Sequence, residues 1–307
     1  MPPIPTLIDC DPGTDDALAL LLALASPELA VRAVTVVGGN VGLDRTLPNA
    51  CAIVALAGAT TPVHAGADRP LLGRFTPEPR VHGPDGLGGI RLPAGAPAQA
   101  EPAADAIRRH LRTSPVPLTL VGIGPATNLA LALATEPALA ANVAEIVLMS
   151  GAWGEGNATP AAEFNAANDP EALAILLAAG RPLTLVGLEL TAQALATPAR
   201  LAALAAAGAG RALGVACAIQ ASVPPSRRLG GAGAALHDPC AIAWLLRPDL
   251  FTGRACPVTV DLAGPSRGRT QIDRWGRTGA RANAQVPETL DADGFFALLG
   301  ERLARLA

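Results

Sequence analysis

The sequence contains no lysine and no tyrosine, and all 23 of its basic residues are arginines. Charged residues make up only 16% of the chain, and the formal net charge is −3. Proteins that bind nucleic acid usually present a strongly basic surface, so this composition predicts no nucleic-acid partner. Hydrophobic residues make up 50% of the 307 residues, which indicates a folded chain with a large core rather than a disordered one.

The sequence also lacks a long hydrophobic run. The longest covers the nine residues 17–25, whereas a helix that spans a membrane needs about 20. The first ten residues, MPPIPTLIDC, contain no basic segment of the kind that begins a secretory signal peptide. We therefore expect no membrane partner and a cytoplasmic location.

The cysteines form no recognisable framework. They are odd in number and scattered, and no two of them form a C-x-x-C pair. This pattern argues against a disulfide scaffold or a zinc knuckle and fits a reducing compartment. The five are Cys10, Cys51, Cys217, Cys240 and Cys256.

Short apolar runs typical of strands alternate along the chain with alanine- and leucine-rich runs typical of helices. Most of the strand runs are continuously apolar, as expected for strands that are covered on both faces. The alternation predicts an α/β fold: one domain over residues 1–307, with a mostly parallel central sheet flanked by helices, an open sheet of Rossmann-like type. The expected strands are 4–9, 31–37, 117–122, 145–150, 182–188 and 258–262. The expected helices are 15–26, 45–57, 103–112, 127–134, 170–179, 198–207, 211–221, 239–246 and 292–306.

Two glycine- and proline-rich stretches interrupt this alternation, at residues 72–97 and 221–234. Loops of this length inside a compact domain are often lids or binding loops. The alternative is plain surface irregularity. We predict that both are active-site loops.

The segment DCDPGTDD places Asp9, Asp11, Asp15 and Asp16 within eight residues, between two apolar runs. Capping of a helix N-terminus can account for Asp15 and Asp16. Asp9 and Asp11 instead follow a strand, at the position where open α/β folds bind ligands. No arginine occurs between residues 4 and 28 to offset the repulsion. Oxygen ligands suit Ca²⁺ and Mg²⁺, so the segment predicts a bound divalent cation.

Asp9 and Asp11 have the D-x-D spacing of the haloacid-dehalogenase-type phosphohydrolases, which use a divalent metal. However, Gly13 stands where that motif has threonine or valine. That family also uses a lysine later in the chain, and this chain has none. A metal-dependent phosphohydrolase is therefore the weaker alternative.

A second series of segments matches another metal-using family, in order and over almost the whole chain. The segments are DCDPGTDDALAL, VVGGN, VHGPDGLGG, LVGIGPATNLALAL, LMSGAWGEGNATPAAEFNAANDPEA and HDPCA. This series resembles the motifs of the inosine–uridine nucleoside hydrolases. The resemblance implies the nucleoside hydrolase fold and hydrolysis of the N-glycosidic bond of a ribonucleoside, which gives ribose and a free base.

The resemblance also assigns roles at a metal centre. Asp11 is the expected general base, which takes a proton from the attacking water. Asp9 is expected to hold Asp11 in position without binding the cation itself. His237 is expected to protonate the departing base, a role that suits the pH range in which histidine titrates. The expected ligands of a Ca²⁺ cofactor are Asp11, Asp16, Asp238 and the backbone carbonyl of Ile123.

The resemblance also implies which residues contact the substrate. His82 is expected near the base. Trp153 is either an aromatic contact of the base or a packing residue, and we expect Phe164 to pack. The expected ribose contacts are Asp15, Asn40, Asn157, Glu163 and Asn165, whose amides and carboxylates match the donors and acceptors of sugar hydroxyls.

The identity of the base is not predicted, because no tyrosine is available to surround it. The resemblance implies a ribonucleoside substrate and a homodimer or homotetramer. A third possibility is a nucleoside-binding protein on the same fold that does no chemistry. Asp11 and His237 argue against this possibility, since binding alone requires neither a base nor an acid.

Overall fold

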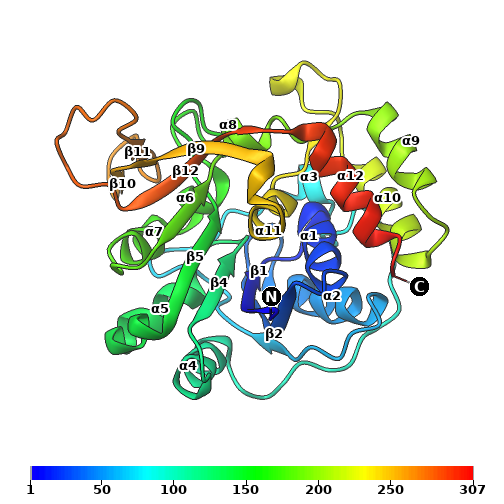
Figure 1. The fold of residues 1–307 in the computed structure, drawn as a ribbon, viewed down its shortest axis with the longest axis horizontal. Helices are drawn as coiled ribbons and strands as arrows, with labels where there is room; N and C mark the ends of the chain where they lie inside the picture. The colour runs from blue at the N-terminus through cyan, green and yellow to red at the C-terminus, as the bar shows by residue number, and fades with distance from the viewer. Residues whose placement is uncertain (1, 307) are drawn as a thin grey trace.

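The computed structural model describes residues 2–306, which form a twisted central sheet between two layers of helices (Figure 1). In order across the sheet the strands are β3 (Val63–Ala65), β2 (Leu29–Val36), β1 (Ile4–Cys10), β4 (Leu118–Gly122), β5 (Val143–Met149), β6 (Leu183–Val186), β12 (Ala284–Leu290) and β9 (Phe251–Cys256). In this order, the strands from β3 to β12 are all parallel to their neighbours, and only the edge strand β9 is antiparallel, to β12. This arrangement confirms the predicted α/β class and mostly parallel sheet.

Each face of the sheet is covered by its own hydrophobic layer. On one face, β4 side chains such as Val121 join a core with α1 (Thr14–Leu24), α2 (Leu43–Leu56), α10 (Arg211–Ser222), α11 (Asp238–Leu246) and α12 (Ala292–Leu303). On the other face, alternate residues such as Leu120 pack on α4 (Ala103–Thr113), α5 (Thr127–Thr135) and α7 (Pro170–Leu177). Because both faces are buried, the inner strands are continuously apolar, as their sequences indicated.

The outer part of the sheet differs from the prediction. The run at 258–262 does not join the central sheet: β10 (Val258–Val260) pairs with β11 (Thr270–Ile272) in a separate hairpin. Strands β3, β9 and β12 were not predicted. Strand β3 has only three residues, and β9 has four exposed residues between buried ends, so neither has a strong apolar run. Strand β12 contains Pro287 beside a register shift, and a proline inside a run argues against a strand.

The predicted helices are all present, with ends that differ by a few residues. Short elements not predicted connect them: α3 (Pro79–His82), α6 (Phe164–Asn168), α8 (Leu188–Thr191), the 3-10 turns η1 (Pro137–Asn142), η2 (Arg227–Leu229) and η3 (Pro248–Leu250), and the paired β7 (Leu195–Ala196) and β8 (Ala234–Ala235). The run predicted as a strand over 182–188 is split, because β6 ends at Val186 and α8 begins two residues later.

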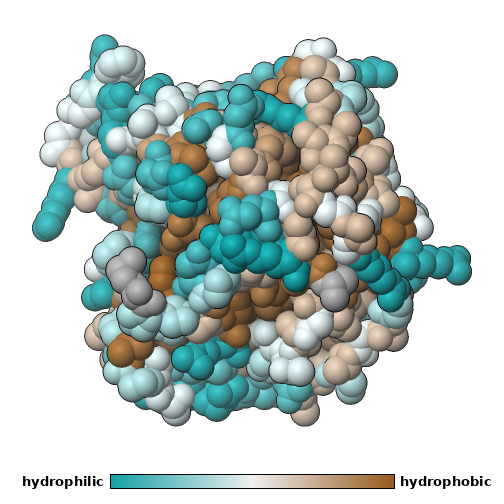
Figure 2. Space-filling view, turned by 45° about the vertical axis from the view of Figure 1, so that its right-hand side comes forward, coloured by the Kyte–Doolittle hydropathy of each residue, from teal (hydrophilic) through white to brown (hydrophobic). Residues whose placement is uncertain are grey.

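Helix α9 (Pro198–Ala206) lies on the outside of the molecule beside α12 and leaves Ala202, Ala205 and Ala206 exposed. Figure 2, which turns this side forward, shows pale-brown, weakly apolar surface over its right-hand half, among polar groups. No helix within residues 2–306 is long and apolar enough to cross a membrane.

Candidate active site

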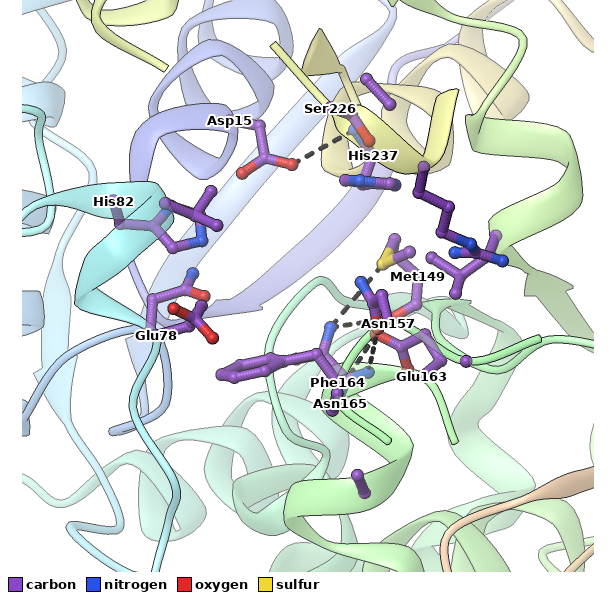
Figure 3. A pocket seen from close by; sticks show the side chains of 18 of the residues that line it. Asp15, Glu78, His82, Met149, Asn157, Glu163, Phe164, Asn165, Ser226 and His237 are labelled. Carbon is purple, nitrogen blue, oxygen red and sulfur yellow. Dashed lines mark hydrogen bonds between the residues drawn. The ribbon is translucent and has the colours of Figure 1, made fainter. Parts of the chain in front are cut away.

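The carboxyl ends of β1, β2, β4 and β5 meet at one edge of the sheet and form the floor of a cavity of about 770 Å³ (Figure 3). This volume is within the range of sites for small molecules. Both predicted loops reach it: residues 76–82, which include α3, form one wall, and residues 223–229 form another. A ligand bound at the carboxyl edge of the sheet would therefore contact both predicted loops.

The first turn of α1 builds an acidic floor. Asp16 accepts hydrogen bonds from Asp11 N at 3.2 Å, Gly13 N at 2.9 Å and Asn40 Nδ2 at 3.0 Å. The carboxylate therefore holds the β1–α1 turn closed from within the N-terminus of the helix. Burial, together with the charge of Asp15, raises the pKa of Asp16 to about 7.

Asp11 lies between the backbones of two glycines. A Cβ atom added to Gly39 would be 2.1 Å from Asp11 Oδ2, and one added to Gly124 would be 2.5 Å from Asp11 Oδ1. Asp11 Oδ2 accepts from Asn40 N at 2.7 Å, whereas the buried Oδ1 atom has no hydrogen-bonding partner among the described residues. Burial and the charge of Asp16 raise the pKa of Asp11 well above 3.8. An unpaired buried carboxylate oxygen is costly, which indicates that a ligand completes this position.

We expect Gly39→Ala to displace the Asp11 carboxylate and to lower by about 100-fold the hydrolysis that the sequence resemblance implies, because Asp11 is the predicted base and small misplacements of a catalytic group cost about that much. The matched control is Gly214→Ala in α10, where an added Cβ atom meets nothing within 4 Å. Initial rates and circular dichroism of both variants check this. Equal activity in the two variants would show that the close fit around Asp11 is unimportant.

Asp15, Asp16 and Asp238 each offer an oxygen atom within 4.8 Å of the others, and all three are buried. Asp238 is the first residue of α11, and Asp15 Oδ2 accepts from His237 N at 3.2 Å, which joins α1 to α11. Burial and the neighbouring carboxylates raise the pKa of Asp238 well above 3.8. Such a set of oxygen donors fits a hard divalent cation.

The carboxylates of this group differ from those of the predicted ligand set: Asp16 and Asp238 are present as predicted, but Asp15, which was expected at the ribose, is in the group and Asp11 is not. Asp11 is joined to the group by the hydrogen bond from its backbone N to Asp16 Oδ1 at 3.2 Å. The Ile123 carbonyl, a predicted ligand, accepts from Asn165 Nδ2 at 3.0 Å and retains a second lone pair.

Asp9 lies at the end of β1 and is fully buried. Its Oδ1 atom accepts from Thr35 Oγ1 at 2.5 Å and from Asn128 Nδ2 at 2.8 Å, so it connects β1 to β2 and α5. Burial raises the pKa of Asp9 to about 7. Asp9 thus supports the strand end from which Asp11 projects.

Three of the five predicted ribose contacts, Asn157, Glu163 and Asn165, form the opposite wall of the cavity (Figure 3). Glu163 caps α6: it accepts from Asn165 N at 2.8 Å and from Ala166 N at 2.9 Å, and also from Gly151 N at 2.9 Å. Asn157 Oδ1 accepts from Phe164 N at 2.8 Å. Glu163 and Asn157 therefore hydrogen-bond the start of α6 and also line the cavity. The fifth predicted contact, Asn40, lines the cavity beside the acidic floor.

Two predicted histidines line the same cavity. His82 Nδ1 lies 3.2 Å from Thr14 N, which can only donate, so Nδ1 is the acceptor and the ring proton is on Nε2. His237 Nδ1 lies 2.7 Å from Thr191 Oγ1. Burial lowers the pKa of both rings. Burial therefore favours the neutral form of both rings, and in that form His82 presents an N–H donor from Nε2.

The aromatic residues are placed differently from the expectation. Trp153 is not among the residues that line the cavity; its ring packs under the Arg274 guanidinium at 4.4 Å. Of its two interpretations, packing agrees with this position. Phe164, expected to pack, instead lines the cavity, and Figure 3 shows its ring directed across it toward Glu78.

Several further lining residues were not predicted, because no motif singles them out. Asn168, three residues after the A-E-F-N segment, accepts from Thr76 N at 2.7 Å and so ties the 72–97 loop to α6. The other polar examples are Glu78, Arg80, Gln220, Arg228 and Arg267.

Known proteins with this fold and cavity define the class. The structure aligns with a purine-preferring ribonucleoside hydrolase from Gardnerella vaginalis with a TM-score of 0.90 at 31% identity, over 98% of each chain. It aligns with a plant nucleoside hydrolase with a TM-score of 0.91 at 32% identity, over 99% of each chain. The chain is a ribonucleoside hydrolase, an enzyme that acts on N-glycosyl compounds.

The family model described as inosine-uridine preferring nucleoside hydrolase matches residues 6–297, and the chain belongs to this family. The chain is 44% identical over 304 residues to the pyrimidine-specific ribonucleoside hydrolase RihA of Shewanella woodyi, over 97% of each chain. It is 42% identical to the RihA of an Enterobacter species over 309 residues and 99% of each chain. These findings confirm the resemblance on which the site was predicted.

Proposed function

We propose that the enzyme is a Ca²⁺-dependent hydrolase of pyrimidine ribonucleosides. The observation that carries the proposal is the juxtaposition of a buried carboxylate group and a wall of amide and carboxylate side chains in one cavity. The pyrimidine preference is supported by the names of relatives that are 42% and 44% identical over nearly the full chain.

The residues proposed to hold Ca²⁺ are Asp11, Asp16, Asp238 and the Ile123 carbonyl, with Asp15 close enough to contribute. The unpaired Asp11 Oδ1 atom and the all-oxygen donor set fit this ion. When bound, the ion would make water more acidic and grip the ribose diol.

The chain supplies the remaining steps of the proposed mechanism. Asp11 accepts the proton of the attacking water through Oδ1, which no protein group occupies among the described residues. Positive charge develops on the ribose as the N-glycosidic bond breaks. The carboxylates of Asp15 and Glu163 stabilise that charge, since both line the cavity. Asn40, Asn157 and Asn165 orient the hydroxyls.

His237 is the proposed acid for the departing base. To donate a proton it must be the imidazolium, in which Nδ1–H donates to Thr191 Oγ1 and the second proton, on Nε2, is transferred to the departing base. His82, on the other side of Asp15 in Figure 3, contacts the base through its Nε2 proton. A cytoplasmic location and a homodimer or homotetramer complete the proposal and rest on the sequence.

The test is ribose release from uridine, cytidine, inosine, adenosine, guanosine and 4-nitrophenyl riboside, with Ca²⁺ and with a chelator. The proposal expects Ca²⁺-dependent release, fastest from uridine and cytidine among the natural nucleosides. Faster release from the purine nucleosides would contradict the base preference. Release unaffected by thorough chelation would contradict the metal.

We expect His237→Ala to lower the rate on uridine by about 100-fold, the usual contribution of a positioned acid. On 4-nitrophenyl riboside, whose leaving group departs without a proton, the loss should stay within a few-fold. Comparing kcat for the two substrates checks this, with His110→Ala on the outer surface of α4 as the control. Equal losses on both substrates would remove His237 from the acid role.

A further inference from the structure

Gln220 is a buried polar side chain that the proposed mechanism does not use. It lies in α10, two residues before the helix ends, and only 2% of its surface is exposed. Its Oε1 atom has no hydrogen-bonding partner among residues 2–306. Leaving a buried amide oxygen unpaired costs about 1–3 kcal/mol, so such a group usually has a partner. Gln220 also lines the active-site cavity, where a ligand can supply that partner.

The part of the cavity around Gln220 lies beside the histidines. The last turn of α10 packs on the loop that follows His82, because a Cβ atom added to Gly88 would lie 1.8 Å from Ser222 Oγ. Gly88 N in turn donates to the His82 carbonyl at 2.9 Å. The wall that contains Gln220 is therefore continuous with His82, at the end of the cavity assigned to the base rather than to the ribose.

Apolar residues from the same helix end and from both loops line the cavity together with Gln220. Val81, Val223, Pro224, Leu229 and Ala235 line the cavity with it. An apolar wall with a free amide suits a flat ring that has apolar faces and one polar edge.

We propose that Gln220 recognises the polar edge of the base and so determines base specificity; this inference rests on the proposed function. A carboxamide presents an acceptor beside a donor. Uracil offers N3–H beside a carbonyl, and cytosine offers N3 beside an amine. A half-turn of the amide matches it to either edge. The enzyme therefore accepts both uridine and cytidine through the same side chain.

The test is Gln220→Leu, which keeps the approximate size and removes the amide. We expect kcat/KM to fall by about 10- to 100-fold for uridine and cytidine, because a polar edge of the base is left unpaired. On 4-nitrophenyl riboside, which lacks that edge, the change should stay within about threefold. The matched control is Gln271→Leu on β11, an exposed glutamine that hydrogen-bonds Asp261 and lies outside the cavity lining.

A second variant distinguishes recognition from packing. Gln220→Glu has nearly the same size but offers acceptors only, so it can accept from uracil N3–H or from the cytosine amine but repels the neighbouring acceptor on either base. We therefore expect kcat/KM to fall by about tenfold for both uridine and cytidine, while the value for 4-nitrophenyl riboside stays within about threefold. Equal losses on all three substrates, or no loss on any, would overturn the role of Gln220. Wild-type enzyme that releases ribose from none of them would overturn the proposed function itself, and this inference with it.

Discussion

Asp11→Asn should lower kcat by about 1,000-fold, in the middle of the range for the loss of a general base. An amide at this position can neither accept a proton nor offer a second charged oxygen to a cation. The substitution is close to isosteric, so the contacts with Gly39 and Gly124 are kept. Removing one of several repelling, buried carboxylates should also leave the melting temperature of the metal-free protein unchanged or higher.

Single-turnover ribose release, together with nucleoside binding by calorimetry, checks this expectation. The control is Asp44→Asn, an exposed carboxylate in the first turn of α2. If Asp11→Asn still binds uridine but no longer releases ribose, the protein is an enzyme and not a non-catalytic binding protein. Retained turnover would exclude Asp11 as the base.

Removal of Ca²⁺ should reduce ribose release to background and should also make stability depend on pH in a particular direction. Burial raises the pKa of Asp9 and of Asp16 to about 7, and that of Asp11 and Asp238 well above 3.8. A carboxyl whose pKa is higher in the folded state binds more protons when folded. Its contribution to stability is therefore complete below pH 4 and is lost as the pH rises through about 7.

The metal-free enzyme should accordingly unfold at a lower temperature at pH 7.5 than at pH 5.5, because Asp9 and Asp16 each lose stabilisation at up to about 1.4 kcal/mol per pH unit as the pH rises toward 7. Added Ca²⁺ should raise the melting temperature much more at pH 7.5, because the cation binds the ionised carboxylates. Thermal unfolding at both pH values, with and without Ca²⁺, measures this.

Asp16→Asn serves as the comparison, since it removes one titrating group and one proposed ligand together. Its pH dependence should be shallower and its Ca²⁺-induced shift smaller. An identical Ca²⁺ shift at both pH values in the wild type would contradict a carboxylate site for the cation.

The parts of this enzyme that could be predicted from sequence are those fixed by local pattern. The segment DCDPGTDD predicted an acidic site at a strand end because its aspartates are close in sequence, and the structure places them at the carboxyl edge of β1. Glu163 and Asn157 could be predicted from their motif. The capping bonds that position these two side chains depend on the turn geometry around α6.

Features set by distant contacts could not be predicted. Strand β12 pairs with β6 across about 100 residues, and its proline-containing sequence is explained only by its antiparallel neighbour at the sheet edge. Trp153 was ambiguous because its partner, Arg274, is 121 residues away in the chain. Phe164 and Gln220 line the cavity because of where their helices begin and end, which a pattern of apolar residues does not specify.

The position of β12 between β6 and β9 has a consequence for how the chain is made. During synthesis, β1 to β6 can assemble as soon as residue 186 is available, but the open edge of β6 must wait for residues 284–290. Until then an unpaired edge of a hydrophobic strand is exposed, and such edges promote aggregation. Helix α12 then packs on α1, and Arg302 forms an ion pair with Glu28 at 2.6 Å. Helix α12, which is made after β12, therefore secures the helix that carries Asp15 and Asp16, so chains truncated before β12 would be aggregation-prone as well as inactive.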